Sequence, residues 1–332
     1  MDFLSEPTLL VAIIEVAIGL FLLSKAADVF VDGAAAVATA AKLSPVVVGA
    51  VVVGFGTSAP ELLVSGIAAQ GGDVDIGLGN IVGSNVANVS LVLGFAALIA
   101  PILVTKSVLV REAPLSVGAV ALFAFFTIGG FAVWEGIVML ALLAAALVWI
   151  IFGGNEDSVE EIEIDEDASM GESMGFTLFG LVGTVLGAQL MVWGAVAIAA
   201  ELGLSGGFVG FTLIALGTSL PELVTAFAAA RKGETELILG NLLGSNMFNS
   251  LAVGGVVAIL GAGELNDRIP ATYGVVAMVI IAAMTWVFMV TRRRVARPEA
   301  IILLGAYIFA ILVIDEDLGV GDAIRSAIGS IA

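Results

Sequence analysis

The 332-residue chain consists mostly of long apolar segments separated by short polar ones. A helix needs about 20 apolar residues to cross the hydrocarbon core of a bilayer, and runs of this length recur along the chain. The sequence therefore predicts an all-α membrane protein with ten transmembrane helices. The predicted spans are 8–37, 45–69, 76–100, 114–130, 134–152, 176–200, 207–230, 237–261, 271–291 and 299–314.

A compound motif occurs twice, at residues 49–94 and 210–255. The two copies align without a gap at an offset of 161, and 19 of their 46 positions are identical. Because five predicted spans, an odd number, separate the copies, the second copy is expected to lie inverted in the membrane. We predict two inverted five-helix repeats, 1–152 and 176–332, a pattern typical of secondary transporters that bind their substrate near the midplane.

The only long polar interruption, predicted as an acidic linker at 153–175, divides the spans five and five. With both termini placed outside, nine of the twelve Lys and Arg residues fall in loops on the cytoplasmic side. Cytoplasmic loops are enriched in Lys and Arg, so this asymmetry predicts a multi-pass protein of the cytoplasmic membrane with extracellular termini. The linker is then cytoplasmic, and we interpret it as a solvated connection.

The composition limits the chemical groups that could act in a site of this protein. Hydrophobic residues make up 60% of the chain and charged residues 13%, and there is no Cys and no His. This excludes disulfides, thiolate nucleophiles, imidazole bases and the commonest zinc ligands, so we expect neither an enzyme nor a bound cofactor. The net charge is −18 with only four lysines, and an acidic, lysine-poor surface is favoured by a high-salt interior, so we predict a halophilic archaeon as the source. We expect no nucleic-acid partner. We expect the protein to function as a monomer in the lipid bilayer.

Each copy of the motif places a proline and a glutamate inside an apolar span, in GTSAPE (56–61) and GTSLPE (217–222). Proline removes a backbone hydrogen bond and frees carbonyl oxygens, which within a membrane must face a cavity or an ion. A charged residue near the centre of a span costs about 2.5–3.5 kcal/mol. Two converging glutamates would repel each other unless a cation lay between them. Ca²⁺ binds carboxylate and carbonyl oxygens, so Glu61 and Glu222, with carbonyls near Thr57 and Thr218, are predicted to form a Ca²⁺ site.

A second polar segment follows each interrupted helix, at 79–88 and 240–249. Gly79 and Gly83 are four residues apart, which allows close helix packing. Ser84 and Asn88 share one helix face and offer neutral oxygens suited to Na⁺. Ser245 and Asn249 repeat this arrangement with Gly240 and Gly244. For the remaining asparagines of these segments, interhelical hydrogen bonding or capping explains their presence at least as well as ion contact: Asn80, Asn85, Asn241 and Asn246.

The paired motifs closely resemble the two α-repeats of the cation/Ca²⁺ exchanger superfamily, and the ten predicted spans resemble its prokaryotic Na⁺/Ca²⁺ exchangers. The resemblance implies that Glu61, Glu222, Thr57 and Thr218 bind Ca²⁺. It also implies that Na⁺ sites are lined by Ser58, Ser84, Ser219, Ser245 and the backbone carbonyls of Gly54 and Ala215. Asn88 and Asn249 would line a central position.

The expected function is therefore antiport of Na⁺ and Ca²⁺ by alternating access. Proton-coupled relatives typically carry G-N-x-x-E in place of GTSxPE, so the GTSxPE motif favours Na⁺ coupling. Asn249 stands where some prokaryotic and K⁺-dependent members carry Asp, which argues against K⁺ dependence. Two carboxylates neutralise one Ca²⁺ and leave a positive charge with three Na⁺, so we predict electrogenic exchange of three Na⁺ for one Ca²⁺. The alternatives are Ca²⁺/H⁺ antiport through the same glutamates and, less directly, a passive cation channel.

Overall fold

The computed structural model describes residues 9–40, 50, 53–152, 170–267, 269–315, 321–322, 324 and 326. The first half contains α1 (Leu9–Ala40), α3 (Gly54–Thr57), α4 (Ala59–Gly71), α5 (Val74–Val86), η2 (Ala87–Val92), α6 (Leu93–Ile99), β1 (Ile102–Leu103), α7 (Lys106–Val110), α8 (Glu112–Phe126) and α9 (Val133–Phe152). The second half contains α10 (Met170–Leu202), α11 (Gly206–Val209), η4 (Gly210–Ile214), α12 (Ala215–Thr218), α13 (Leu220–Lys232), α14 (Thr235–Phe248), η5 (Asn249–Val253), α15 (Gly254–Leu260), η6 (Pro270–Gly274), α16 (Val275–Arg292), β2 (Arg294–Val295) and α17 (Arg297–Ile314). The η elements are π-helical.

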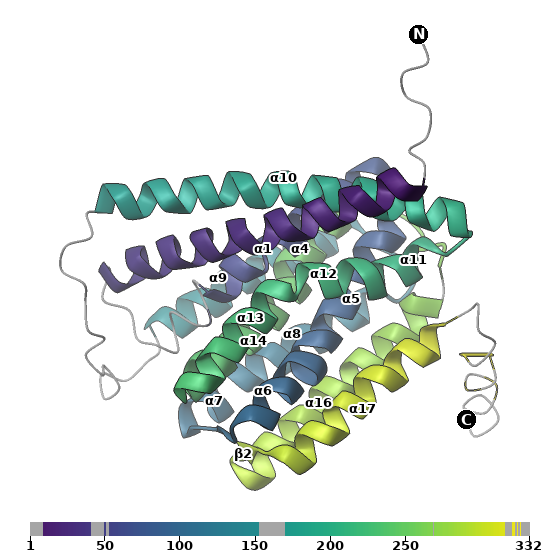
Figure 1. Cartoon of the computed structure of the whole chain (residues 1–332). Helices are drawn as coiled ribbons and strands as arrows, with labels where there is room; N and C mark the ends of the chain where they lie inside the picture. Colours follow the sequence, from purple (N-terminus) through teal and green to yellow (C-terminus); the bar gives the residue numbers. More distant parts are fainter. Residues whose placement is uncertain are drawn as a thin grey trace.

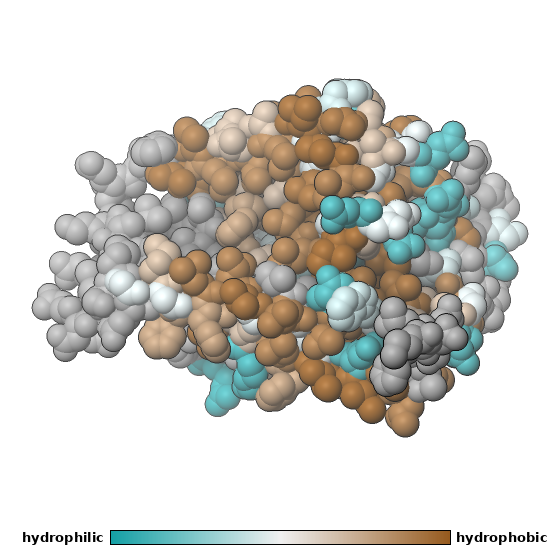
Figure 2. Space-filling view, turned by 90° about the horizontal axis from the view of Figure 1, so that it is seen from above, coloured by the Kyte–Doolittle hydropathy of each residue, from teal (hydrophilic) through white to brown (hydrophobic). Residues whose placement is uncertain are grey.

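Helices occupy each of the ten ranges predicted as spans. In the described part of the chain, six helices are long and apolar enough to cross a membrane, and a bent pair, Gly210–Thr218 with Leu220–Arg231, makes a seventh. Their exposed side chains are largely apolar, and the space-filling view shows hydrophobic residues over much of one face, with most of the hydrophilic residues toward its right-hand side (Figure 2). The chain is therefore a mostly helical membrane protein.

Two helical rods form the centre of the molecule. One runs through α5, η2 and α6, and the other through α14, η5 and α15. In the most apolar 18-residue stretch of each rod, 83% and 89% of the residues, respectively, are buried inside the protein. The interrupted helices α3–α4 and α12–α13 pack against them. The motif residues therefore lie in the interior, away from the surface that contacts lipid.

The long helices α1 and α10 lie side by side along one face of the other helices (Figure 1). Glycines allow their close contact: a Cβ atom added to Gly194 would lie 2.5 Å from the carbonyl oxygen of Ala12. At Gly187 an added Cβ would lie 2.8 Å from the backbone nitrogen of Leu23. Small residues of this kind allow membrane helices to approach each other closely.

Two short β contacts join the halves at opposite ends of α8. Before α8, β1 pairs antiparallel with β2, which lies between α16 and α17. After α8, Phe131 forms a single bridge with Gly263. These contacts satisfy backbone groups outside the helices and tie the connecting segments of one half to those of the other.

Within the described part of the chain, two predicted boundaries differ from the observed ones by more than three residues. The span predicted to end at residue 130 ends at Phe126, because the chain then turns through Gly129 and Gly130, both with positive φ. The second half was predicted to begin its first helix at 176, but α10 begins at Met170, within the range assigned to the linker. Residues 153–169 of that linker lie outside the described part of the chain.

Candidate cation-binding site

Both interrupted helices break at the serine of the GTSxPE motif. Helix α3 ends at Thr57 and α4 begins at Ala59, with Ser58 between them at φ −82° and ψ 0°. The second copy breaks at Ser219, with φ −81° and ψ 5°, and the helix axis bends there by 45°. Because proline follows within two residues and donates no backbone hydrogen bond, the turn before it cannot close as a regular helix. The prediction of interrupted helices is confirmed.

The partner helices also change their winding at the motif. The first π-helical segment, η2, begins one residue before Asn88, and the second, η5, begins at Asn249. Within membrane helices such segments are frequent at functional sites, because the extra residue redirects side chains. Both asparagines are completely buried where the α-helix changes to the π-helix.

The Thr57 hydroxyl links the two halves of the chain. It donates to Oδ1 of Asn241 at 3.2 Å and lies 3.3 Å from Oγ of Ser245. Ser245 in turn lies 3.4 Å from the carbonyl oxygen of Gly54. Hydroxyl, amide and backbone oxygens from α3 and α14 thus gather at one point, between elements far apart in sequence.

The second copy repeats this arrangement. Thr218 donates to Oδ1 of Asn80 at 3.2 Å and lies 3.5 Å from Oγ of Ser84. The Thr218 hydroxyl also lies 3.4 Å from the carbonyl oxygen of Ala215, and Thr57 lies 3.5 Å from that of Gly54. The two halves of the cluster therefore have nearly the same local geometry.

The two motif glutamates lie between these halves, and both are fully buried. Oγ of Ser219 donates to Oε1 of Glu61 at 3.4 Å, and Thr218 lies beside the same carboxylate. Glu222 lies beside Thr57 and close enough to Glu61 for the two charges to interact. Two buried carboxylates close enough to interact repel each other unless a cation or proton compensates their charge.

Several oxygens of the cluster receive no hydrogen bond from the residues that the structure describes. They are Oγ of Ser58, Oε2 of Glu61, both carboxylate oxygens of Glu222, Oδ1 of Asn88 and Oδ1 of Asn249. Buried oxygens without hydrogen-bond donors are rare in proteins, whereas hard cations are coordinated by such groups. Across the described part of the chain, no three Asp or Glu side chains gather into a metal site. The cluster is therefore a cage of mostly neutral oxygens around two carboxylates.

Not all twelve predicted site residues are joined by direct contacts. Asn88 donates to Oδ1 of Asn246 at 3.1 Å, and Asn246 donates to the carbonyl oxygen of Asn85. The side chains of Ser58 and Asn249 make no hydrogen bond to the other predicted residues within the described ranges. The remaining nine are brought together by the contacts above: Gly54, Thr57, Glu61, Ser84, Ala215, Thr218, Ser219, Glu222 and Ser245.

The asparagines excluded from the predicted site form interhelical hydrogen bonds, as the sequence suggested. Asn85 donates to Ser250 at 3.0 Å, while Asn80 and Asn241 accept from the two motif threonines. What the sequence did not reveal is that these last two contact predicted cation ligands directly. Their presence in both copies of the motif was the available signal.

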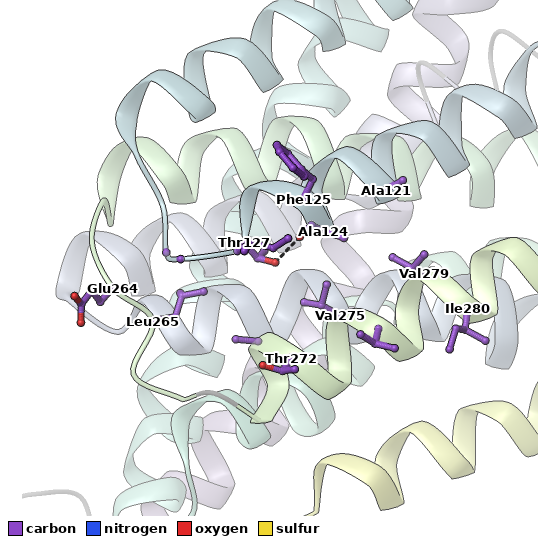
Figure 3. A pocket seen from close by; sticks show the side chains of 15 residues that line it. Ala121, Ala124, Phe125, Thr127, Glu264, Leu265, Thr272, Val275, Val279 and Ile280 are labelled. Atoms are coloured by element: carbon purple, nitrogen blue, oxygen red, sulfur yellow. Dashed lines mark hydrogen bonds between the residues drawn. The ribbon is translucent and has the colours of Figure 1, made fainter. Parts of the chain in front are cut away.

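A separate groove of about 850 Å³ lies between the end of α8 and the start of α16 (Figure 3). Its walls are apolar, with Thr127, Thr272 and Glu264 as polar groups. It shares no residue with the oxygen cluster and offers one carboxylate, so it lacks the chemistry of a cation site.

Comparison with known proteins agrees with the geometry. The sequence matches the family described as sodium/calcium exchanger protein over residues 11–152 and 172–314. An uncharacterised membrane protein of Methanocaldococcus jannaschii is 36% identical over 294 residues, which cover 89% of this chain and 95% of that protein. The sodium/calcium exchanger MaX1 of Methanosarcina acetivorans is 29% identical over an alignment of 341 positions, which covers 90% of this chain and 96% of MaX1. A solved structure of the sodium-calcium exchanger NCX_Mj, soaked with Na⁺ and Ca²⁺, is similar with a TM-score of 0.71 and 31% identity; the match covers 92% of this chain and 99% of that chain.

Proposed function

The chain belongs to the sodium/calcium exchanger protein family, and on this premise we propose that it exchanges Na⁺ for Ca²⁺ across the cytoplasmic membrane by alternating access. One observation carries the proposal. The buried carboxylates of Glu61 and Glu222 lie together, and three of their four oxygens accept no hydrogen bond from the described residues. A divalent cation between them balances both charges and supplies the missing partners.

The ligand roles follow from the chemistry of each oxygen. Ca²⁺ is held by Glu61, Glu222, Thr57 and Thr218, because carboxylates carry the charge that a divalent ion requires. Na⁺ is held by neutral oxygens, from the side chains of Ser58, Ser84, Ser219 and Ser245 and the carbonyls of Gly54 and Ala215. Asn88 and Asn249, which enter the cluster through its π-helical segments, line a central position between these sites.

The exchange is electrogenic in this proposal, with three Na⁺ for one Ca²⁺. Two carboxylates give the site a charge of −2, so one Ca²⁺ leaves it neutral and three Na⁺ leave it at +1. A membrane potential therefore acts on the Na⁺-loaded form.

The proposed architecture is ten spans in two inverted repeats, 1–152 and 176–332, with the linker at 153–175 cytoplasmic and both termini outside. The nearly equal contacts of the two threonines support it, because the two repeats supply equivalent groups to the two halves of the cage.

The test is uptake of ⁴⁵Ca²⁺ into proteoliposomes loaded with Na⁺ and diluted into Na⁺-free buffer. Vesicles loaded with choline, with and without an imposed pH gradient, are the controls. We expect uptake only with internal Na⁺, and faster uptake when the imposed potential favours Na⁺ exit. Uptake driven by the pH gradient alone would assign the protein to Ca²⁺/H⁺ antiport, and uptake without any counter-ion would indicate a channel. A reversal potential that fits two Na⁺ per Ca²⁺ would overturn the proposed stoichiometry.

We expect Asn249→Asp to change competition by Na⁺ or protons while Ca²⁺ binding is largely retained. The Asn249 side chain is completely buried, and neither of its polar atoms has a partner among the described residues. A third carboxylate there adds negative charge at the centre of the cage, and at low pH it binds a proton. The measurement is Ca²⁺ uptake as a function of Na⁺ concentration and pH, with Asn266→Asp on an exposed loop as the control for added charge. Complete loss of Ca²⁺ binding would show that the ligands are placed wrongly.

A further inference from the structure

The two halves of the oxygen cluster differ in how one asparagine is fixed. Nδ2 of Asn80 donates to Oγ of Ser65 at 2.9 Å. The residue 161 positions after Ser65 is Ala226, which is 1% exposed and has no side-chain acceptor. Accordingly, Nδ2 of Asn241 is buried and has no hydrogen-bond partner among the described residues. The amide of Asn80 is therefore anchored through both its nitrogen and its oxygen, whereas that of Asn241 is anchored through its oxygen.

Amide orientation matters because each asparagine contacts a threonine hydroxyl. A hydroxyl has one hydrogen and two lone pairs, and it binds a cation through a lone pair. Its hydrogen must therefore point away from the ion, toward another acceptor. Oδ1 of Asn80 is that acceptor for Thr218, and Oδ1 of Asn241 is that acceptor for Thr57, both at 3.2 Å.

We propose that Asn80 and Asn241 are positioning residues for the threonine ligands, and that Ser65, which has no counterpart at Ala226, makes the Thr218 half of the cage the better-ordered one. The inference rests on the proposed function, because it assumes that the cluster binds the transported cations. Asn80 and Asn241 bind no ion themselves; they hold hydroxyl hydrogens out of the cage.

Rotation of the amide distinguishes the halves. An asparagine turned by 180° presents its NH₂ group where its oxygen was. For Asn80 this turn removes the hydrogen bond that Nδ2 donates to Ser65 and requires the Ser65 hydroxyl to reverse and donate to the amide oxygen, whereas for Asn241 it breaks no bond from Nδ2. A turned Asn241 donates to Thr57, whose own hydrogen then turns to the carbonyl oxygen of Gly54, 3.5 Å away. That carbonyl is a proposed Na⁺ ligand, so the turned state weakens both kinds of ion contact on this side.

The test exchanges the anchoring serine between the halves. Ser65→Ala removes the anchor from the first half, and Ala226→Ser supplies one to the second. We expect the half-saturating Ca²⁺ concentration to rise about two- to tenfold in Ser65→Ala and to fall by a similar factor in Ala226→Ser, which is the range of a single hydrogen bond. Binding is read as the Ca²⁺-dependent rise in the unfolding temperature of the purified full-length protein, and transport as ⁴⁵Ca²⁺ uptake.

Matched variants separate this effect from a general change in packing. Ala230→Ser introduces a hydroxyl at another buried position of α13. Ser90→Ala removes a hydroxyl that, among the described residues, bonds the Val86 carbonyl of its own rod. Both are expected to keep the wild-type half-saturation. The two test variants are expected to shift the half-saturating Ca²⁺ concentration in opposite directions. A purely structural role of these positions does not produce that result. The proposal is overturned if either test variant binds Ca²⁺ as its matched control does. Failure of the wild type to bind Ca²⁺ would instead refute the proposed function.

Discussion

Na⁺-driven Ca²⁺ uptake is expected to disappear when either Glu61 or Glu222 is replaced by glutamine. Both side chains are fully buried, and together they are the only acidic groups of the cluster among the described residues. The substitution keeps the size of the side chain and removes one of the two negative charges. It also introduces an NH₂ group into a cage in which oxygens should face the ion.

The expected effect is large because the lost interaction is with a divalent ion. At an effective dielectric constant of about 20, two unit charges 4 Å apart interact by about 4 kcal/mol, and a divalent ion doubles this value. Every 1.4 kcal/mol is a factor of ten in affinity, so half of the interaction is worth roughly a thousandfold. Ca²⁺ concentrations that half-saturate the wild type then leave the site almost empty.

The measurement is ⁴⁵Ca²⁺ uptake into Na⁺-loaded proteoliposomes, with the amount of folded protein checked by size-exclusion chromatography. Glu299→Gln is the control, because Glu299 is also buried but forms an ion pair with Arg292 at the end of α16, outside the cluster. This control is expected to transport normally. Robust uptake by Glu61→Gln or Glu222→Gln would refute the assignment of the Ca²⁺ ligands.

The interrupted helices could be predicted from the sequence because their cause is local. Pro60 and Pro221 prevent regular helix formation wherever they stand in a span, and the observed breaks fall two residues before them, at Ser58 and Ser219. Likewise, Glu61 in an apolar span indicates a polar interior whatever the neighbouring helices are. The repeat then extended both inferences to the second half.

The contacts between the halves could not be predicted in the same way. Asn80 and Asn241 lie on helices whose register against the interrupted helices is set by packing across the whole molecule. One helical position changes the direction of a side chain by about 100°, so residue spacing alone does not determine which oxygen meets which hydroxyl. The π-helical segments at Asn88 and Asn249 add a further rotation that the sequence pattern does not show.

The second large effect is expected at Gly83 and Gly244, which are related by the offset of 161. A Cβ atom added to Gly83 would lie 2.3 Å from the carbonyl oxygen of Phe211 and 2.6 Å from Cβ of Ala215. At Gly244 it would lie 2.5 Å from the carbonyl oxygen of Ala50. These neighbours include backbone atoms, which cannot move aside as a flexible side chain can. The close approach predicted from the glycine spacing is confirmed for Gly83 and Gly244.

We therefore expect Gly83→Ala and Gly244→Ala to reduce both stability and transport. Overpacking of a close contact typically costs about 1–3 kcal/mol, and here it also pushes α5 away from the segment that carries Ala215 and Thr218. The measurements are the apparent unfolding temperature of the purified protein and its ⁴⁵Ca²⁺ uptake. Gly118→Ala on α8 is the matched control, because its added Cβ meets no atom within 4 Å. It should leave transport unchanged and preserve or slightly raise stability, since alanine favours the helix. If Gly83→Ala behaved like Gly118→Ala, the helices would have to be farther apart than the structure places them, and the oxygen cage could not form at the described distances.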